Sequence, residues 1–198
     1  MCWRSSVRRS SSRVACSLGV LLFACAGFLA AAKAADERDA RLQQLARQAS
    51  IEPYPVAMRA PPFRLPRLQG DAASNADFKG KIVLLSFWAS WCASCKADFP
   101  ALERLQSMFD REDFEVVGIA VFDTPGSIRR FLGLRPPPFP ILLDTDKKVA
   151  EQYRAAGVPV AYLLDRDGRI VAGKSGEHRW DDAPTIAVVR HLLAKSGM

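Results

Sequence analysis

Apolar residues in this chain gather in short continuous runs that alternate with segments of helical periodicity. Runs typical of buried strands lie at residues 82–87, 115–121, 141–143 and 160–164. Helical patterns lie at residues 39–49, 127–134, 146–156 and 181–195, and another follows Cys95 with apolar residues at Leu102, Leu105, Met108 and Phe109. Because a helix separates the first two strands, they are expected to pair in parallel. The pattern predicts an α/β fold with a central mixed sheet flanked by helices.

Weaker patterns fill the rest of the chain. Residues 52–62 contain four prolines and are predicted to be an extended linker. Residues 63–68 alternate like a short edge strand that Pro66 interrupts. The turn residues at 165–168 predict a hairpin from the strand at 160–164 to residues 169–173. We therefore expect a short helix and linker over residues 35–56 and the domain proper over residues 57–198.

Residues 1–34 have the organisation of an export signal. Four arginines precede an uncharged, mostly apolar run at residues 14–32, and residues 32–34 have the small-x-small form of a leader-peptidase site. The run of 19 residues is also close to the roughly 20 that span a bilayer, so an uncleaved anchor is an alternative. Cys25 could mark a lipoprotein signal, but the chain stays apolar after it, where a lipidated protein should become polar. Arg8-Arg9 could mark a twin-arginine signal, but the residues after it lack the apolar character that such a signal usually shows. Every alternative places the domain in the periplasm or on the outer face of the bacterial inner membrane.

The basic charge of the chain belongs mostly to this N-terminal segment. The formal net charge is +7, and removing residues 1–34 takes away five basic residues and no acid, which leaves +2. The remaining basic residues are interleaved with acids, as on a solvated surface. The charge pattern therefore argues against a nucleic-acid partner.

Two of the five cysteines lie outside the predicted export signal. Of five cysteines, Cys2, Cys16 and Cys25 lie within residues 1–34, which leaves Cys92 and Cys95. A disulfide across two intervening residues restricts the unfolded chain by only about 2 kcal/mol in the loop-entropy model. A purely structural role for this pair is therefore poorly motivated.

The position of the pair favours redox chemistry. Cys92 and Cys95 stand where the apolar run at residues 82–87 gives way to a helical pattern. The first sulfur of such a motif lies near the free N–H groups and the positive dipole end of the helix, which favour a thiolate over a thiol. The sequence thus indicates an activated dithiol.

Several landmarks in the same order give the chain a family resemblance. They are Ala-Pro-Pro-Phe-Arg-Leu-Pro at residues 60–66, Phe-Lys-Gly-Lys at 78–81, Phe-Trp-Ala-Ser-Trp-Cys-Ala-Ser-Cys at 87–95, Gly-Val-Pro at 157–159, and Tyr-Leu-Leu-Asp-Arg-Asp-Gly-Arg-Ile at 162–170. Over roughly residues 60–180 the chain resembles the thioredoxin fold, and more narrowly the exported TlpA/ResA-like thiol-disulfide oxidoreductases of the redoxin family. The resemblance implies a thioredoxin fold with an N-terminal extension.

The resemblance also implies roles for individual residues. Cys92 would be the exposed attacking sulfur and Cys95 the shielded resolving one. Pro159, preceded by Val158, would be a cis-proline that packs beside the disulfide and helps to dock extended substrate backbone. Trp91 would flank the site. From the residues alone, a proline at position 159 is more often a trans residue that starts an edge strand, and Trp91 could be a core aromatic residue.

Asp98 is the third catalytic candidate. Three further positions carry residues that differ from those common in the family. Asp98 follows Cys95 by one helical turn, where the family commonly has a glutamate, and a carboxylate there can take or return the proton of the buried thiol. The alternative is an exposed acid that the helix dipole favours. Ala93 and Ser94 stand where many relatives have a proline, and Ser86 stands where cytoplasmic thioredoxins have a buried acid. The redox poise therefore cannot be taken from relatives.

The predicted activity is thiol-disulfide exchange on exported proteins through Cys92 and Cys95, without a cofactor. The family context favours a reductant in cytochrome c maturation or copper-site assembly, which a membrane electron donor re-reduces. Its partners would be cysteine-containing exported proteins, with membrane contact only through an uncleaved N-terminal segment. We expect a monomer.

Two alternatives remain from the sequence: a general periplasmic dithiol oxidase and a copper-carrying module that uses the two cysteines. Outside the signal, the histidines available as further metal ligands are His178 and His191, thirteen residues apart. They provide no second close pair, so we assign no metal ligands. His178 is predicted to be a surface residue.

Overall fold

The structure is a computed structural model that describes residues 37, 39–133 and 136–194. The predicted export signal, residues 1–34, lies outside the described residues. The chain divides into two compact units, residues 1–40 and 41–198, and the strands and helices from β1 to α5 belong to the second unit. Among the described residues, no helix has both the length and the apolar character needed to cross a membrane.

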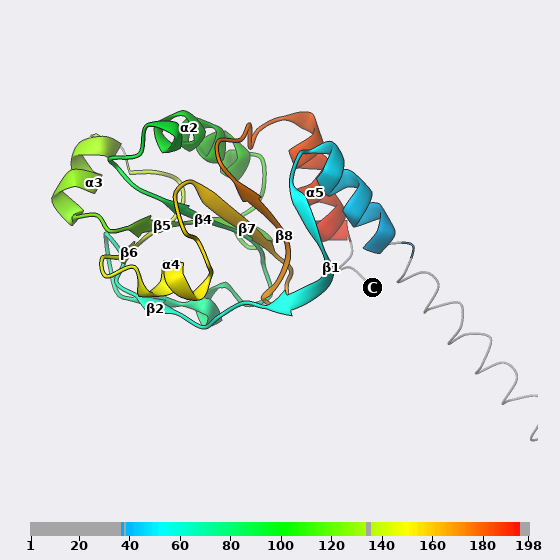
Figure 1. Ribbon diagram of the computed structural model, residues 1–198, viewed down its shortest axis with the longest axis horizontal. Helices are drawn as coiled ribbons and strands as arrows, with labels where there is room; N and C mark the ends of the chain where they lie inside the picture. Colours follow the sequence, from blue (N-terminus) through cyan, green and yellow to red (C-terminus); the bar gives the residue numbers. More distant parts are fainter. Residues whose placement is uncertain (1–36, 38, 134–135, 195–198) are drawn as a thin grey trace, which may run out of the picture. The chain divides into compact units, whose positions relative to one another are not determined.

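A six-stranded mixed sheet forms the centre of this unit (Figure 1). Its strands, in spatial order, are β1 (Glu52–Arg59), β8 (Arg169–Ser175), β7 (Val160–Leu164), β4 (Ile82–Trp88), β5 (Phe114–Val121) and β6 (Ile141–Asp144). The neighbouring pairs β4–β5 and β5–β6 are parallel, and the others are antiparallel. The predicted strands, the parallel pair and the β7–β8 hairpin are confirmed.

Helices and a small second sheet complete the unit. They are α2 (Ala93–Ser107), α3 (Pro125–Leu132), α4 (Lys148–Gln152), α5 (Ala183–Ala194), the 3-10 helix η1 (Asn75–Phe78), and the strands β2 (Arg64–Leu65) and β3 (Ala73–Ser74). The predicted edge strand near residue 65 is β2, which pairs with β3, and the residues that follow it bridge antiparallel to β6 at the edge of the main sheet through Arg67 and Leu142. Residues 41–48 are also helical, as predicted.

Each face of the sheet has its own apolar core. On one face, Leu84 of β4 belongs to a cluster that includes Phe99 of α2 and Val188 of α5. On the other face, Leu85 of β4 shares a cluster with Val149 of α4. Figure 1 shows α2 and α3 on one side of the sheet and α4 with β2 on the other. Coverage of both faces explains why β4 and β5 are continuous apolar runs without alternation.

The segment predicted to be a proline-rich linker forms the edge strand β1. It pairs antiparallel with β8, and the register shifts between Pro53 and Met58. Proline has no backbone N–H to donate, so it is tolerated on an edge strand where one side of the backbone is unpaired. The prolines therefore mark a sheet edge here.

Two helices end earlier than the sequence indicates. The helix predicted over residues 146–156 is the short α4, because Lys147 before it and Arg154 after it have φ angles of 63° and 56°. A right-handed helix requires negative φ. Similarly, α2 ends before Met108, whose side chain is 49% exposed, while Leu105 is buried as expected.

Gly118 of β5 gives room to the aromatic residue that ends β4. A Cβ atom at Gly118 would lie 2.8 Å from Cδ1 of Ile141 and 3.0 Å from Nε1 of Trp88. Trp88 is 2% exposed and packs against Phe99 of α2 at 5.0 Å between ring centroids. This packing anchors the carboxyl end of β4, where the cysteine motif begins.

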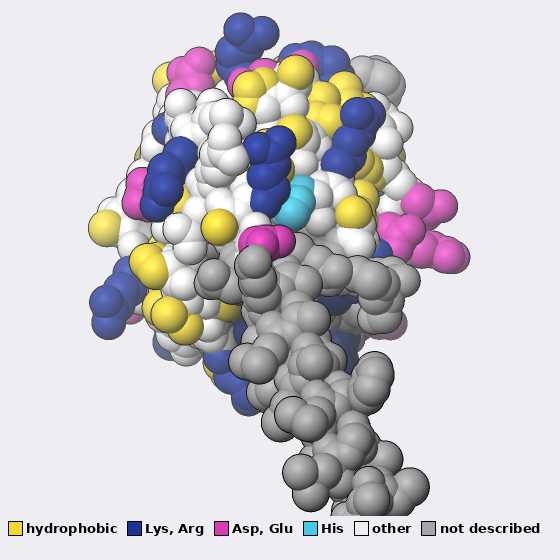
Figure 2. Space-filling model, turned by 90° about the vertical axis from the view of Figure 1, so that its right-hand side faces the viewer, with side chains coloured by type: hydrophobic (Ala, Val, Ile, Leu, Met, Phe, Trp, Pro, Cys, Tyr) yellow, Lys and Arg dark blue, Asp and Glu magenta, His cyan; other side chains and the backbone are white. Residues whose placement is uncertain are grey.

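The surface is mixed in charge. On the face in Figure 2, the Lys and Arg side chains are spread among apolar, acidic and uncharged ones. This distribution agrees with the interleaved charges of the sequence.

Candidate functional site

A disulfide between Cys92 and Cys95 lies at the junction of β4 and α2. Cys92 is 6% exposed and Cys95 2%, so both residues are buried in this disulfide and the prediction of an exposed Cys92 is wrong. Cys92 is the N-cap of α2, and its sulfur accepts a hydrogen bond from the backbone N–H of Cys95 at 3.2 Å. The hydroxyl of Ser94 lies 3.5 Å from the same sulfur. A sulfur at a helix N-terminus beside such donors is in a position that favours a thiolate over a thiol.

The segment before β7 forms the second wall of the site. The peptide bond between Val158 and Pro159 is cis, as the resemblance implied. The carbonyl oxygen of Val158 lies 3.6 Å from the sulfur of Cys92. A peptide backbone that reaches Cys92 therefore meets the backbone of Val158.

Trp91, the residue before Cys92, is exposed to solvent. Its side chain is 62% exposed, and its indole N–H donates to the carbonyl oxygen of Phe122 at 3.2 Å. The alternative of a core aromatic residue is therefore wrong for Trp91. Trp88 takes that position instead.

Asp98 is buried on α2, one turn beyond Cys95. The residue is 4% exposed, and its Oδ1 accepts a hydrogen bond from the backbone N–H of His178 at 3.0 Å. Burial raises the pKa of this carboxyl above its ordinary value, against the opposing effect of that hydrogen bond. The alternative of an exposed first-turn acid is therefore wrong. A carboxyl with a raised pKa can exchange protons closer to neutral pH.

His178 is not the surface residue that the sequence predicted. It is half-buried, its Nε2 lies 2.9 Å from Oγ1 of Thr185, and its ring meets Trp180 edge-on at 4.6 Å. Burial lowers its pKa. Its contact with Asp98 joins residues 80 positions apart, and no local sequence pattern indicates such a contact.

Asp123 is a site residue that the sequence analysis missed. It is 7% exposed and accepts hydrogen bonds from the backbone N–H and hydroxyl of Ser90 at 2.6 and 3.0 Å. It also accepts from the backbone N–H of Thr124 at 2.8 Å. Asp123 thus fixes the turn that leads into Cys92, and its place directly after an apolar run was the available signal.

The described residues do not bring together three or more His, Cys, Asp or Glu side chains in a way that could hold a metal ion. The chemistry that these residues can supply is an exchange of thiols and disulfides, with a buried carboxyl one helical turn beyond the second cysteine.

Comparisons with known proteins agree with this geometry. A family model described as the AhpC/TSA family matches residues 56–172. The chain is 32% identical over 117 residues to the thiol-disulfide oxidoreductase ResA of Bacillus subtilis, which covers 59% of this chain and 65% of that protein. It is 37% identical over 115 residues to the thioredoxin-like protein YneN of the same organism, which covers 57% and 66%. The chain thus spans just under two thirds of each of these relatives.

Solved structures extend the similarity to the fold. A DsbF homologue from Corynebacterium diphtheriae superposes with a TM-score of 0.60 and 27% identity, over 71% of this chain and 91% of that one. The predicted resemblance and the thioredoxin-like α/β fold are confirmed, and relatives carry the name of the predicted enzyme class.

Proposed function

This chain belongs to the AhpC/TSA family, whose model matches residues 56–172, and we propose that it is a thiol-disulfide oxidoreductase acting on exported proteins. One observation carries the proposal: the disulfide of Cys92 and Cys95 caps α2 beside the cis bond between Val158 and Pro159. The names of the relatives support the same chemistry.

The proposed reaction has two exchange steps. In the reduced protein, the Cys92 thiolate attacks one sulfur of a client disulfide, and the other client sulfur leaves as a thiolate. Cys95 then loses its proton and attacks the sulfur of Cys92, which releases the second client sulfur. The client gains two electrons and two protons in total, and the protein is left with the disulfide seen here.

Asp98 is proposed to take the proton of Cys95 in the second step. Both residues are buried, at 4% and 2% exposure, and they lie one helical turn apart on α2. Water therefore has poor access to the Cys95 thiol, so a nearby buried carboxylate gives its proton a route out.

The physiological direction is proposed to be reduction, in cytochrome c maturation or copper-site assembly. The N-terminal pattern of the sequence supports an exported protein, and a membrane electron donor would restore the dithiol after each turnover. A reduction potential near −270 mV is typical of a reductant, and one near −120 mV is typical of a strong oxidant. Equilibration of the purified protein with glutathione measures this potential, and a value near −120 mV would favour the general oxidase.

Trapping of clients tests the assignment of the two sulfurs. Cys95→Ser should retain client proteins as mixed disulfides that dithiothreitol releases, because the resolving thiol is absent. Cys92→Ser should neither trap clients nor reduce insulin. The double variant serves as the control for non-specific capture. Equal trapping by the two single variants would contradict the roles proposed for Cys92 and Cys95.

A further inference from the structure

A cavity of about 350 Å³ opens beside the disulfide, on the side of Val158. Its base is apolar, with Val121 and Ala150, and its wall carries the exposed aromatic side chains of Trp91 and Phe122. Because Val158 both lines this cavity and touches the sulfur of Cys92, a chain that reaches the sulfur passes the cavity.

Two residues of the cavity have backbone conformations that are unfavourable for their type. Phe122 has φ 48° and Lys147 has φ 63°, and bulky residues rarely adopt the left-handed region. The backbone N–H groups of both residues donate to the carbonyl oxygen of Asp144, at 3.0 and 3.3 Å. The fully buried carboxylate of Asp144 accepts from the backbone N–H groups of Val149 and Ala150 at the start of α4. One residue therefore holds both unfavourable conformations in place.

These conformations present side chains to solvent next to the reactive sulfur. Phe122 is 60% exposed and Trp91 is 62% exposed, and the two are joined by the hydrogen bond from the indole to the Phe122 carbonyl. The Nζ of Lys147 lies 4.0 Å from the centroid of the Phe122 ring. Backbone strain that displays exposed aromatic groups at a site is characteristic of a ligand-binding function.

The cavity is lined by one cation, Lys147, and one acid, Glu151, and further cations lie on the neighbouring helices. Lys96, Arg129 and Arg130 are exposed on the neighbouring helices α2 and α3, and Lys96 and Arg130 border an adjoining hollow with Ser90. Among the described residues, these three and Lys147 take part in no ion pair. An acidic partner is the electrostatic complement of this surface.

We propose that Trp91, Phe122 and Lys147 form a binding surface, here called the client platform, for the substrate protein, or client. The platform contacts the residues on either side of the client's reactive cysteine. The cavity takes a large apolar side chain, and Lys147 pairs with an acidic side chain next to it. The inference rests on the proposed function and adds to it the class of client: an extended segment with an apolar and an acidic residue beside the reactive cysteine.

Peptides with an activated disulfide test the platform. Each peptide carries one cysteine linked to thionitrobenzoate, whose release is followed by absorbance, flanked by Glu-Leu, Lys-Leu or Glu-Ser. The reduced full-length protein should react with the Glu-Leu peptide about tenfold faster than with the Lys-Leu peptide, because the platform is cationic. Lys147→Glu should reverse this ratio. Arg190→Glu, an equal charge reversal at an exposed position of α5, should leave the ratio unchanged.

A second variant separates the platform from folding. Phe122→Gly removes the ring but suits φ 48°, so its melting temperature should equal or exceed that of the wild type. Its preference for Glu-Leu over Glu-Ser should nevertheless fall about tenfold, because the aromatic wall is lost. Ser50→Gly, also at a positive φ of 55°, should keep the preference.

The outcomes separate this inference from the proposed function. Equal rates for all three peptides, unchanged in Lys147→Glu and Phe122→Gly, would overturn the platform and leave thiol-disulfide exchange standing. A wild type that releases thionitrobenzoate neither from the peptides nor from its free disulfide would overturn the proposed function itself.

Discussion

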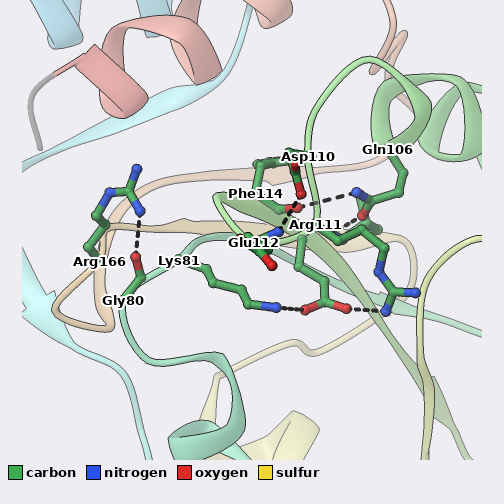
Figure 3. A network of polar contacts seen from close by, with 10 residues as sticks. Gly80, Lys81, Gln106, Asp110, Arg111, Glu112, Phe114 and Arg166 are labelled. Atoms are coloured by element: carbon green, nitrogen blue, oxygen red, sulfur yellow. Dashed lines mark hydrogen bonds and ion pairs between the residues drawn. The ribbon is translucent and has the colours of Figure 1, made fainter. Parts of the chain in front are cut away.

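A buried carboxylate lies at each end of the central strands, and the two carboxylates have different partners. At the amino end, Glu115 is 3% exposed and pairs with Nζ of Lys81 at 2.7 Å and with Nη2 of Arg111 at 2.5 Å. Figure 3 labels both cations, Lys81 and Arg111. At the carboxyl end, Asp98 is equally buried, and its hydrogen bonds come from uncharged groups, the backbone N–H of His178 and the side chain of Trp180. Among the described residues, Asp98 takes part in no ion pair, and the same is true of the buried Asp123 and Asp144 at this end.

The same contrast extends to the backbone. At the amino end, the buried side chain of Gln106 donates to the carbonyl oxygen of Phe114 at 3.2 Å (Figure 3). The same side chain accepts from the N–H of Val116 at 2.7 Å. At the carboxyl end, Phe122 and Lys147 keep unfavourable φ angles. Unfavourable backbone and exposed aromatic groups are concentrated at the end that carries the disulfide, which is where function can offset their cost.

The largest expected effect is a loss of stability when both cations that pair with Glu115 are removed. The double variant Lys81→Met/Arg111→Met should lower the free energy of unfolding by about 3 kcal/mol, since it leaves a charge buried without a partner. This value is at the low end for broken buried pairs, because the side chains of Lys81 and Arg111 are 25% and 57% exposed. Urea denaturation of the oxidised protein measures the loss.

A triple variant checks the cause of that loss. Adding Glu115→Leu should recover most of the stability, because an apolar side chain replaces the isolated charge. Neither variant should change the rate of disulfide exchange per folded molecule. A double variant as stable as the wild type would show that Glu115 reaches water without its partners.

Asp98 should show the opposite behaviour, with a smaller effect that falls on the rate. Asp98→Asn keeps an oxygen that can accept from His178 but cannot take a proton, so exchange at neutral pH should slow about tenfold. Asp98→Glu, which retains a carboxyl, should recover part of the rate. An unchanged pH–rate profile in Asp98→Asn would contradict a proton-transfer role.

The pH dependence of stability tests Asp98 independently of the rate. Because burial raises its pKa above 3.8, its contribution to stability is fully present below pH 3.8 and is lost as the pH rises through the raised value. Asp98→Asn removes this dependence. The variant should therefore gain stability relative to the wild type as the pH rises above 3.8, which urea denaturation of the oxidised proteins at several pH values measures.

The sequence was sufficient for most of the fold because the strands are strongly apolar. Residues 82–87 and 115–121 are buried on both faces of the sheet, so their runs are continuous and easily read. The segment around Pro53 was misread, because prolines that belong to a sheet edge look the same as prolines in a linker. Edge pairing depends on β8, which lies more than a hundred residues away.

The site was predictable only where its residues are neighbours in the chain. Cys92, Cys95 and Asp98 share one helix, so their spacing indicated a common face. The contact of Asp98 with His178 depends on how α5 and the segment before it pack, and local patterns do not encode this. The positive φ of Phe122 likewise results from tertiary hydrogen bonding to Asp144, against the preference of the residue itself.

The smallest expected effect concerns Arg166, at the amino end of the strands. Its guanidinium donates to the carbonyl oxygen of Gly80 at 2.6 Å and pairs with Oδ1 of Asp113 at 2.7 Å. The two charged side chains are 28% and 57% exposed, so water screens the pair, and Arg166→Gln should cost only about 0.5–1 kcal/mol of unfolding free energy. Arg104→Gln, which breaks the exposed pair with Asp181, gives a matched control and should cost no more. A loss above about 2 kcal/mol for Arg166→Gln alone would mean that the amino end depends on this screened pair as much as on the buried Glu115.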